Sequence, residues 1–261
     1  MAKVTTGYKD HIAYVTLARP DKHNALNEEM ISAIVAAGQE VAASDARAVV
    51  LSGAGKSFCA GLDLAALAGL AQRDVQNWLM ERTHGDTNEF QEVAMVWRRV
   101  PVPVIAAIHG ACFGGGLQIA LGADIRVAHP EAQLSVMEMK WGLVPDMGGM
   151  ALLPRLLRTD ILRRLTYTAE KVEAQQALDW GLVSELAPNP LFRANELATA
   201  IAAQSPSAIR AAKRLIGYAE SEAAQADVLL RESAEQADLI GKPDQLQAVA
   251  DQLKKHTPEA G

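Results

Sequence analysis

The sequence predicts an α/β fold, in which a core of strands and helices is followed by a helical C-terminal region. The first half of the chain alternates short apolar runs with stretches of helical periodicity. Fully apolar strands separated by helices are typical of a sheet covered on both faces. After Pro188-Asn-Pro190, the chain shows only helical periodicity and is rich in alanine. We therefore expect a core over residues 1–190 and a helical region over residues 191–261.

The first predicted strand spans Ile12–Leu17, a run that ends at Arg19-Pro20. A helix follows, with Asn27 as its N-cap and with Glu28 and Glu29 in its first turn, where carboxylates interact favourably with the helix dipole. Its apolar positions lie on one face, so the helix can pack on the sheet. The residues of this apolar stripe are Met30, Ile34, Ala37 and Val41.

Three further strands are predicted from apolar runs, at Ala48–Leu51, Val102–Ile108 and Ile125–Ala128. The stretch Val100–Ala123 has no charged residue and is long enough in principle to cross a bilayer. It contains two prolines and five glycines, however, which favour a strand, a glycine turn and a buried helix. We therefore expect no membrane-spanning segment.

In the C-terminal region, Ser205-Pro206-Ser207 predicts the start of a helix, and Gly241-Lys-Pro243 predicts the end of the long helix before it. These alanine-rich helices have too few apolar residues to form a core of their own. We expect them to bury their apolar stripes against a neighbouring subunit, which predicts a homo-oligomer.

Charge and cysteine content exclude several classes of protein. The 261-residue chain has 25 basic and 31 acidic residues, for a net charge of −6, whereas proteins that bind nucleic acid through its phosphates usually have the opposite balance. Cys59 and Cys112 are too few for a disulfide scaffold and lack the spacing of metal ligands. The N-terminal residues show no signal-peptide pattern. We expect a cytoplasmic protein that binds neither nucleic acid nor metal.

The glycine-rich segments do not match the motifs of nucleotide-binding proteins or serine hydrolases. Gly53–Ser57 resembles the end of a phosphate-binding loop, but Val50 stands where the first glycine of that loop is required. His109–Gly116 lacks the dinucleotide-binding spacing, and no GxSxG motif occurs in the chain. Nucleotide-dependent and serine-hydrolase chemistry are therefore disfavoured.

Two other segments place small residues after an apolar strand, at Phe58–Leu64 and Gly110–Gly116. Glycine lets the backbone approach a ligand closely, and a following helix directs free N–H groups toward negative charge. Two such turns could donate two hydrogen bonds to one oxygen, which is an oxyanion hole. The alternative is that the glycines only permit close packing of strand and helix.

Five segments, in order, resemble motifs of the crotonase family, the enoyl-CoA hydratase/isomerase superfamily. They are the RP…NALN element at Arg19–Asn27, the FxAGxDL element at Ser57–Leu64, the glycine-rich turn at Gly110–Leu117, the E…GLxPDxGG stretch at Glu138–Gly149 and the AxxxGLV element at Ala177–Val183. The resemblance covers about residues 10 to 190 and is followed by a helical tail, as in the family.

This resemblance implies a crotonase-like spiral of ββα units with a helical C-terminal trimerisation region, and hence a homotrimer or a dimer of trimers. It also implies an acyl-CoA thioester substrate, in which coenzyme A is part of the substrate and no separate cofactor is needed. The oxyanion hole would be formed by the backbone N–H groups of Leu62 and Gly115. Lys22 and His23 would lie near the nucleotide end of CoA, and Ala60 would contact the substrate.

The carboxylates bear on which reaction is expected. By resemblance, hydratases of the family use two glutamates, the second of which matches Glu138, whereas the first falls at Gln118 here. An amide can contact substrate and orient water but cannot exchange a proton near neutral pH. We therefore favour a double-bond shift with Glu138 as base over hydration. An enoyl-CoA hydratase and a non-catalytic protein that binds CoA esters remain as alternatives.

Two acidic residues have competing interpretations. Glu138 lies among apolar neighbours and is either a buried base with a raised pKa or a surface residue beside Lys140. Asp146 follows Pro145 and either caps the next helix or is catalytic. By resemblance, an aspartate at this position is catalytic in dienoyl-CoA isomerases and in isomerases of aromatic acyl-CoA breakdown. Dienoyl-CoA isomerases differ in carrying an aspartate at the position of Gln118.

Overall fold

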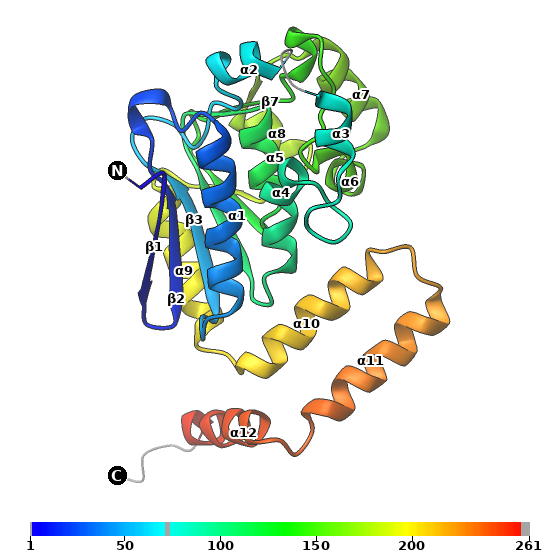
Figure 1. Ribbon diagram of the computed structural model, residues 1–261. Coiled ribbons are helices and arrows are strands. Elements are labelled where there is room, and N and C mark those ends of the chain that lie inside the picture. Colours follow the sequence, from blue (N-terminus) through cyan, green and yellow to red (C-terminus); the bar gives the residue numbers. More distant parts are fainter. Residues whose placement is uncertain (1, 71–73, 257–261) are drawn as a thin grey trace.

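The computed structural model describes residues 2–70 and 74–256, which form an α/β core followed by a helical extension (Figure 1). The main sheet has six strands in the order β1-β2-β3-β4-β6-β9, and all neighbours pair in parallel except the antiparallel β1 and β2. A second sheet has the order β5-β7-β8. The strands of the main sheet are β1 (Val4–Lys9), β2 (Ile12–Leu17), β3 (Ala48–Gly53), β4 (Val104–Ile108), β6 (Ile125–Ala128) and β9 (Glu185–Leu186); those of the second are β5 (Ala111–Phe113), β7 (Gln133–Ser135) and β8 (Val172–Glu173).

Helices cover both faces of the main sheet, as the apolar strands predict. Alternate residues of β3 point to opposite sides, so that Val49 packs in the larger core cluster with α1 and α4, and Val50 packs in a smaller one with α9. Ala194 and Ala198 of α9 are completely buried on that second face. The first helix of the C-terminal region therefore completes the core layer. These helices are α1 (Glu28–Ala42), α4 (Glu89–Arg99) and α9 (Pro190–Ala202).

The remaining helices surround the site or form the tail. Around the upper part of the core in Figure 1 lie α2 (Leu64–Leu70), α3 (Val75–Met80), α5 (Gly115–Leu121), α6 (Gly149–Leu152), α7 (Thr159–Thr168) and α8 (Ala174–Asp179). The 3₁₀ turns are η1 (Pro20–Lys22), η2 (Glu138–Trp141) and η3 (Leu153–Arg155). The tail consists of α10 (Pro206–Ala219), α11 (Gln225–Leu239) and α12 (Pro243–His256).

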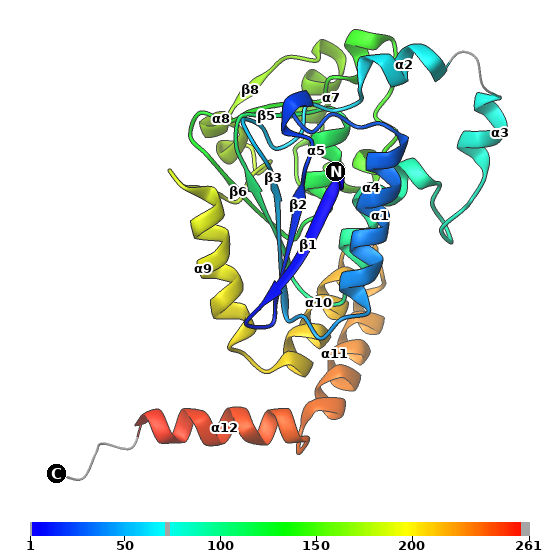
Figure 2. The same cartoon turned by 60° about the vertical axis from the view of Figure 1, so that its left-hand side comes forward.

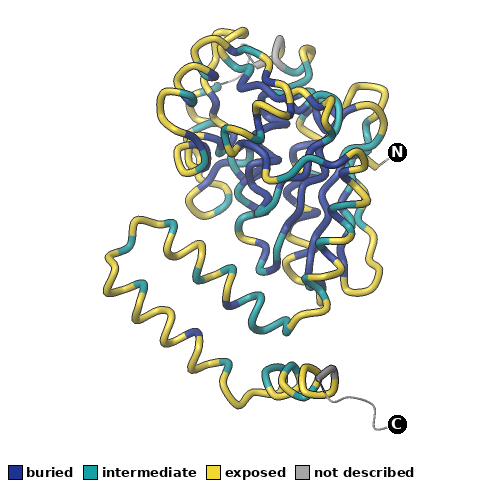
Figure 3. The backbone as a smooth tube through the Cα atoms, turned by 180° about the vertical axis from the view of Figure 1, so that it is seen from behind, coloured by how far each residue is buried: buried dark blue, intermediate teal, exposed yellow. Residues whose placement is uncertain are grey.

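The tail extends away from the core, and most of its surface is exposed (Figures 2 and 3). It is attached to the core through Lys213 of α10, whose ammonium group donates to the carbonyls of Trp97 (3.2 Å) and Val102 (2.9 Å) and contacts the Asp124 carboxylate at 2.8 Å. Three partners for one buried ammonium group offset its loss of hydration. This anchor fixes where the tail leaves the core.

The expected elements are confirmed where periodicity or a cap marks them. The strand at Ile12–Leu17 has the predicted bounds, and Asn27 caps α1 by accepting a hydrogen bond from the Met30 N–H at 3.1 Å. Ser205 likewise caps α10. Strand β1 was not predicted, because it is an edge strand with mostly exposed residues and no continuous apolar run. No helix in the described part of the chain combines the length and apolarity needed to cross a bilayer.

Candidate active site

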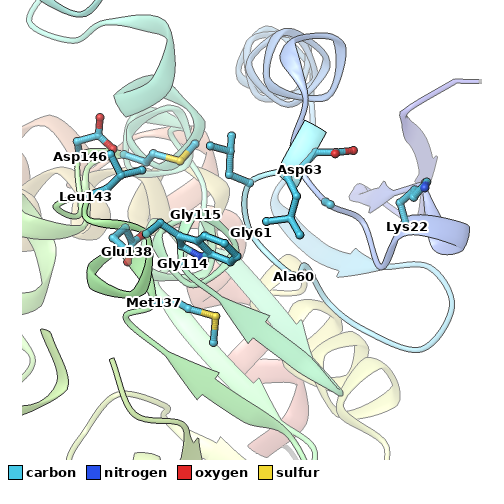
Figure 4. A pocket seen from close by; sticks show the side chains of 15 residues that line it. Lys22, Ala60, Gly61, Asp63, Gly114, Gly115, Met137, Glu138, Leu143 and Asp146 are labelled. Atoms are coloured by element: carbon cyan, nitrogen blue, oxygen red, sulfur yellow. The ribbon is translucent and has the colours of Figure 1, made fainter. Parts of the chain in front are cut away.

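A pocket of about 420 Å³ lies where four separate loops meet (Figure 4). Its volume is in the range of small-molecule sites. Glu138 and Asp146 lie at one end of the pocket, and Lys22 lies at the opposite end. The residues that line it are Lys22, Ala25, Ala60, Gly61, Leu62, Asp63, Leu64, Gly114, Gly115, Met137, Glu138, Trp141, Leu143, Asp146 and Met147.

The loop after β2 and the loop after β3 are joined by Asn24, which is completely buried. Its amide group donates to three carbonyls of the loop after β3, those of Ala54 (2.9 Å), Ser57 (2.8 Å) and Phe58 (3.1 Å). Its side-chain oxygen accepts from the Arg19 N–H at 2.9 Å. The asparagine of the NALN element thus has a structural role, since it holds Lys22 and Ala25 beside the glycine segment after β3.

The two glycine segments pack directly against each other. The Cys59 N–H donates to the Ala111 carbonyl, and the Phe113 N–H donates to the Cys59 carbonyl, both at 3.0 Å. A Cβ atom at Gly61 would lie 2.7 Å from the Phe113 oxygen, and one at Gly116 would lie 2.4 Å from the Cys59 oxygen. The glycines therefore permit close packing, and that packing also brings two turns to one side of the pocket.

The N–H groups of Leu62 and Gly115 are available to a ligand. Hydrogen bonds of Leu26 to the Gly61 carbonyl and of Asp63 to the Leu26 carbonyl, both 2.8 Å, fix the chain on each side of Leu62. Gly115 is the first residue of α5, a position whose N–H has no partner within the helix. Among the described residues, neither N–H donates to another backbone group. Two N–H groups without a backbone partner are one requirement of the expected oxyanion hole.

Glu138 begins η2 and lies in the pocket wall. Its Oε1 accepts a hydrogen bond from the Gln118 amide at 2.6 Å, whereas its Oε2 is buried and has no hydrogen-bond partner among the described residues. Burial raises the pKa of the Glu138 carboxyl, the charge of Asp146 also raises it, and the hydrogen bond from Gln118 lowers it. A buried carboxylate with a raised pKa is suited to act as a general base. The surface interpretation of Glu138 is thereby excluded.

Asp146 faces the same pocket and does not cap the next helix. The N-cap of α6 is Gly148, with a φ of 93°, and no side chain accepts a hydrogen bond there. Although Asp146 is one of the more exposed residues of the wall, desolvation by the surrounding protein raises the pKa of its carboxyl. Of the two interpretations of Asp146, the helix cap is therefore wrong.

Asp63, which the sequence did not single out, is a third carboxylate at the pocket. The Ala65 N–H and Arg19, whose guanidinium lies 2.8 Å from the carboxylate, lower the pKa of Asp63. A carboxylate stabilised in its ionised form is a weak base. Asp63 thus supports the loop rather than taking up a proton.

The other expected site residues divide into two groups. Lys22 and Ala60 line the pocket. His23 and Gln118 do not. The Nδ1 of His23 contacts the Ser57 hydroxyl at 3.0 Å, and Gln118 contacts Glu138 with only 2% of its own surface exposed. Gln118 therefore reaches the pocket through Glu138, because its oxygen and its amide nitrogen are hydrogen-bonded to protein groups, and not by the direct substrate contact that we expected.

The apolar wall of the pocket was not predicted. Met137, Trp141 and Leu143 surround Glu138 in the sequence, and Met147 follows Asp146. Their closeness in sequence to the two acids could have indicated the wall, but apolar side chains in a short loop are equally typical of a core.

In the described part of the chain, no three His, Cys, Asp or Glu side chains are grouped closely enough to hold a metal ion.

Comparison with known families matches residues 7–255 to the enoyl-CoA hydratase/isomerase family. The chain belongs to this family. The expected family and fold class are confirmed, and so is the expectation of an acyl-CoA-processing enzyme.

Relatives of this enoyl-CoA hydratase/isomerase family member include isomerases and hydratases. It is 37% identical over 222 residues to the mitochondrial Δ(3,5)-Δ(2,4)-dienoyl-CoA isomerase of Rattus norvegicus, a match that covers 81% of this chain and 67% of the rat protein. It is 36% identical over 215 residues to enoyl-CoA hydratase EchA19 of Mycobacterium tuberculosis, covering 81% of this chain and 79% of that protein. Among solved structures, an enoyl-CoA hydratase of Mycobacterium smegmatis superposes with a TM-score of 0.87 at 29% identity and 99% coverage of both chains.

Proposed function

We propose that this family member shifts a double bond in an acyl-CoA thioester by proton transfer. The observation that carries the proposal is the environment of Glu138, whose carboxylate faces the pocket and is contacted at 2.6 Å by the amide of Gln118. A second glutamate at the position of Gln118 would help activate water, but the amide of Gln118 cannot exchange a proton. A double-bond shift needs no water, so one base that takes up a proton and returns it is sufficient.

The steps follow from the positions of the groups. The thioester oxygen accepts hydrogen bonds from the Leu62 and Gly115 N–H groups, which stabilise the negative charge that develops on it. Glu138 removes a proton from C2, and the electrons of that C–H bond form an enolate conjugated with the double bond. Return of a proton to C4 of a 3-enoyl thioester, or to C6 of a 3,5-dienoyl thioester, completes the shift. Every proton removed is returned, so the shift needs no separate cofactor. Coenzyme A takes part only as a portion of the substrate.

The pocket wall supports a hydrocarbon acyl group as substrate. Trp141, Leu143, Met137 and Met147 present apolar surface next to Glu138. Burying such surface against an acyl chain contributes about 25 cal/mol per Å². The apolar wall and the similarity to the rat dienoyl-CoA isomerase together favour unsaturated fatty acyl thioesters.

Hydration is the second candidate, because Glu138 and Asp146 both face the pocket and both carboxyls have raised pKa values. A panel of 3-enoyl-, 3,5-dienoyl-, aromatic and 2-enoyl-CoA thioesters separates the two reactions. We expect the isomerisation rate on the 3-unsaturated substrates to exceed the hydration rate on 2-enoyl-CoA. Fast hydration of 2-enoyl-CoA with slow isomerisation would show that the proposal is wrong.

Asp146→Asn is expected to distinguish two kinds of isomerisation. C6 of a dienoyl chain lies four bonds from C2, beyond easy reach of one carboxylate, so Asp146 acts as the second proton carrier for that substrate. We expect kcat on a 3,5-dienoyl thioester to fall about 10- to 100-fold, with a smaller loss on a 3-enoyl thioester. An equal loss on both substrates would contradict this division of roles. Loss of all activity in Asp146→Asn but not in Glu138→Gln would make Asp146 the base.

The tail supports assembly into a homotrimer or a dimer of trimers. The tail exposes large apolar side chains, among them Leu230 at 71%, Ile240 at 63% and Ile216 at 60%. Such a surface is stabilised when it is covered by another subunit. Sedimentation at micromolar concentration should give a mass near three or six times 27.9 kDa, and Leu230→Glu should weaken the assembly. A monomer in the unmodified protein would exclude this assembly.

A further inference from the structure

Gln118 makes three hydrogen bonds from a nearly fully buried position. Its oxygen accepts from the backbone N–H of Met147 at 2.9 Å and from that of Gly149 at 2.8 Å. Its amide nitrogen donates to Oε1 of Glu138 at 2.6 Å. Since two N–H donors engage the oxygen, the NH₂ group has to face the carboxylate, which defines the orientation of the amide.

The chain around Asp146 is shaped to receive this side chain. A Cβ atom at Gly149 would lie 2.8 Å from both the Cγ and the Oε1 of Gln118, so only glycine leaves room for the amide. The two N–H groups that Gln118 accepts from belong to Met147, directly after Asp146, and to Gly149. One glutamine thus contacts Glu138 and the backbone that carries Asp146, although Glu138 and Asp146 come from different turns.

We propose that Gln118 is a positioning residue that sets the geometry of the Glu138 carboxylate relative to the Asp146 loop. This inference rests on the proposed function, in which Glu138 is the base. Gln118 holds Oε1 through its amide, and Oε2 is buried without a hydrogen-bond partner among the described residues, so Gln118 is the side chain that orients this carboxylate.

An amide suits this role because it does not titrate. A carboxylate at this distance from Glu138 would share one proton with it, since two like charges so close cannot both ionise readily. Gln118 instead donates the same hydrogen bond at every pH and favours the ionised form of Glu138. This hydrogen bond lowers the pKa of Glu138, whereas burial and the charge of Asp146 raise it.

Gln118→Leu tests the proposal, since leucine keeps much of the volume and removes all three hydrogen bonds. We expect kcat for isomerisation to fall about tenfold, with KM changed less than twofold, and the acidic limb of the kcat profile to move to higher pH. Gln175→Leu is the matched control, because the Gln175 amide also donates to a carboxylate, that of Asp179 at 2.9 Å, but at an exposed position. The control should leave all three quantities unchanged.

Gln118→Glu separates positioning from a loss of packing. A protonated carboxyl can accept from Met147 and Gly149 and donate to Glu138, whereas an ionised one repels Glu138. We therefore expect this variant to recover activity over Gln118→Leu only at pH values where the carboxyl pair keeps one proton. Equal activity of both variants at every pH, or an unshifted acidic limb in Gln118→Leu, would overturn the proposal.

A readout that does not use the reaction keeps the two proposals distinguishable. The infrared band of the protonated Glu138 carboxyl, identified by its loss in Glu138→Gln, reports the pKa of Glu138 without substrate. We expect a higher pKa in Gln118→Leu than in the unmodified protein, and an unchanged or lower one would refute the role of Gln118. If the unmodified protein hydrates 2-enoyl-CoA instead of isomerising, the proposed function fails, but this pKa difference still tests Gln118.

Discussion

Glu138→Gln should lower turnover by about 10²- to 10⁴-fold while thioester binding remains nearly unchanged. Glutamine keeps the shape of the side chain and can still accept the hydrogen bond from Gln118, but it cannot take up a proton from C2. In the proposed function, binding depends on the Leu62 and Gly115 N–H groups and the apolar wall, which the substitution leaves in place. Steady-state kinetics and equilibrium titration with a substrate analogue measure the two effects separately.

Glu131→Gln is the matched control, because Glu131 is an exposed glutamate in the turn before β7. It should keep the activity of the unmodified protein. Isomerisation by Glu138→Gln at the rate of the unmodified protein would remove Glu138 as the base.

The pH dependence of the unmodified enzyme should reflect the raised pKa of Glu138. The base acts in its ionised form, so kcat should rise with pH through a pKa above the ordinary value of about 4.3. Stability should show the opposite sign. A carboxyl whose pKa is raised by folding contributes stability at low pH, and this contribution is lost as pH rises through the folded-state pKa. Glu138→Gln should therefore be at least as stable as the unmodified protein near neutral pH, which a comparison of Tm values checks.

Gly61→Ala should reduce turnover by about 10²- to 10³-fold through the oxyanion hole. Gly61 has a φ of 90°, and an added Cβ atom would lie 2.7 Å from the Phe113 oxygen and 3.6 Å from the Gly115 nitrogen. Because the colliding atom belongs to the backbone, the two loops have to separate, and the N–H groups of Leu62 and Gly115 can then no longer reach one oxygen. We expect weaker binding of an enolate-like thioester analogue as well as the lower kcat.

Gly85→Ala controls for backbone strain, since Gly85 also has a positive φ, of 74°, but open space at the Cβ position. It should cost stability without the large loss of turnover. Equal losses of kcat in the two variants would show that strain or unfolding, and not the geometry of the N–H groups, causes the effect.

Several features of the fold follow from local sequence. The sequence predicts both ends of the strand at Ile12–Leu17 and the start of the helix capped by Asn27, because periodicity and capping act between neighbouring residues. Strands β8 and β9 have only two residues each and lack a local signal. They form because the chain passes beside an existing sheet edge, which depends on the tertiary fold.

The site divides in the same way. The sequence indicated Glu138, the two glycine segments and the amide at Gln118 through motifs, and it left the role of Asp146 open. The structure excluded the cap role of Asp146, since Gly148 is the N-cap of α6 and no side chain accepts a hydrogen bond there, and it identified the apolar wall around Trp141. Both results depend on how the loops around the pocket are placed relative to one another, which local sequence patterns do not specify.

By itself, the sequence determined the family, the fold class and the presence of one carboxylate and one amide where two carboxylates would serve hydration. Only the tertiary structure decided what that amide does, because Gln118 is 20 residues from Glu138 and 29 and 31 residues from the N–H donors of Met147 and Gly149. Hydrogen bonds form within about 3 Å. Partners so distant in sequence are therefore selected by the packing of α5 against the loops that carry the two acids, and no local pattern specifies that packing.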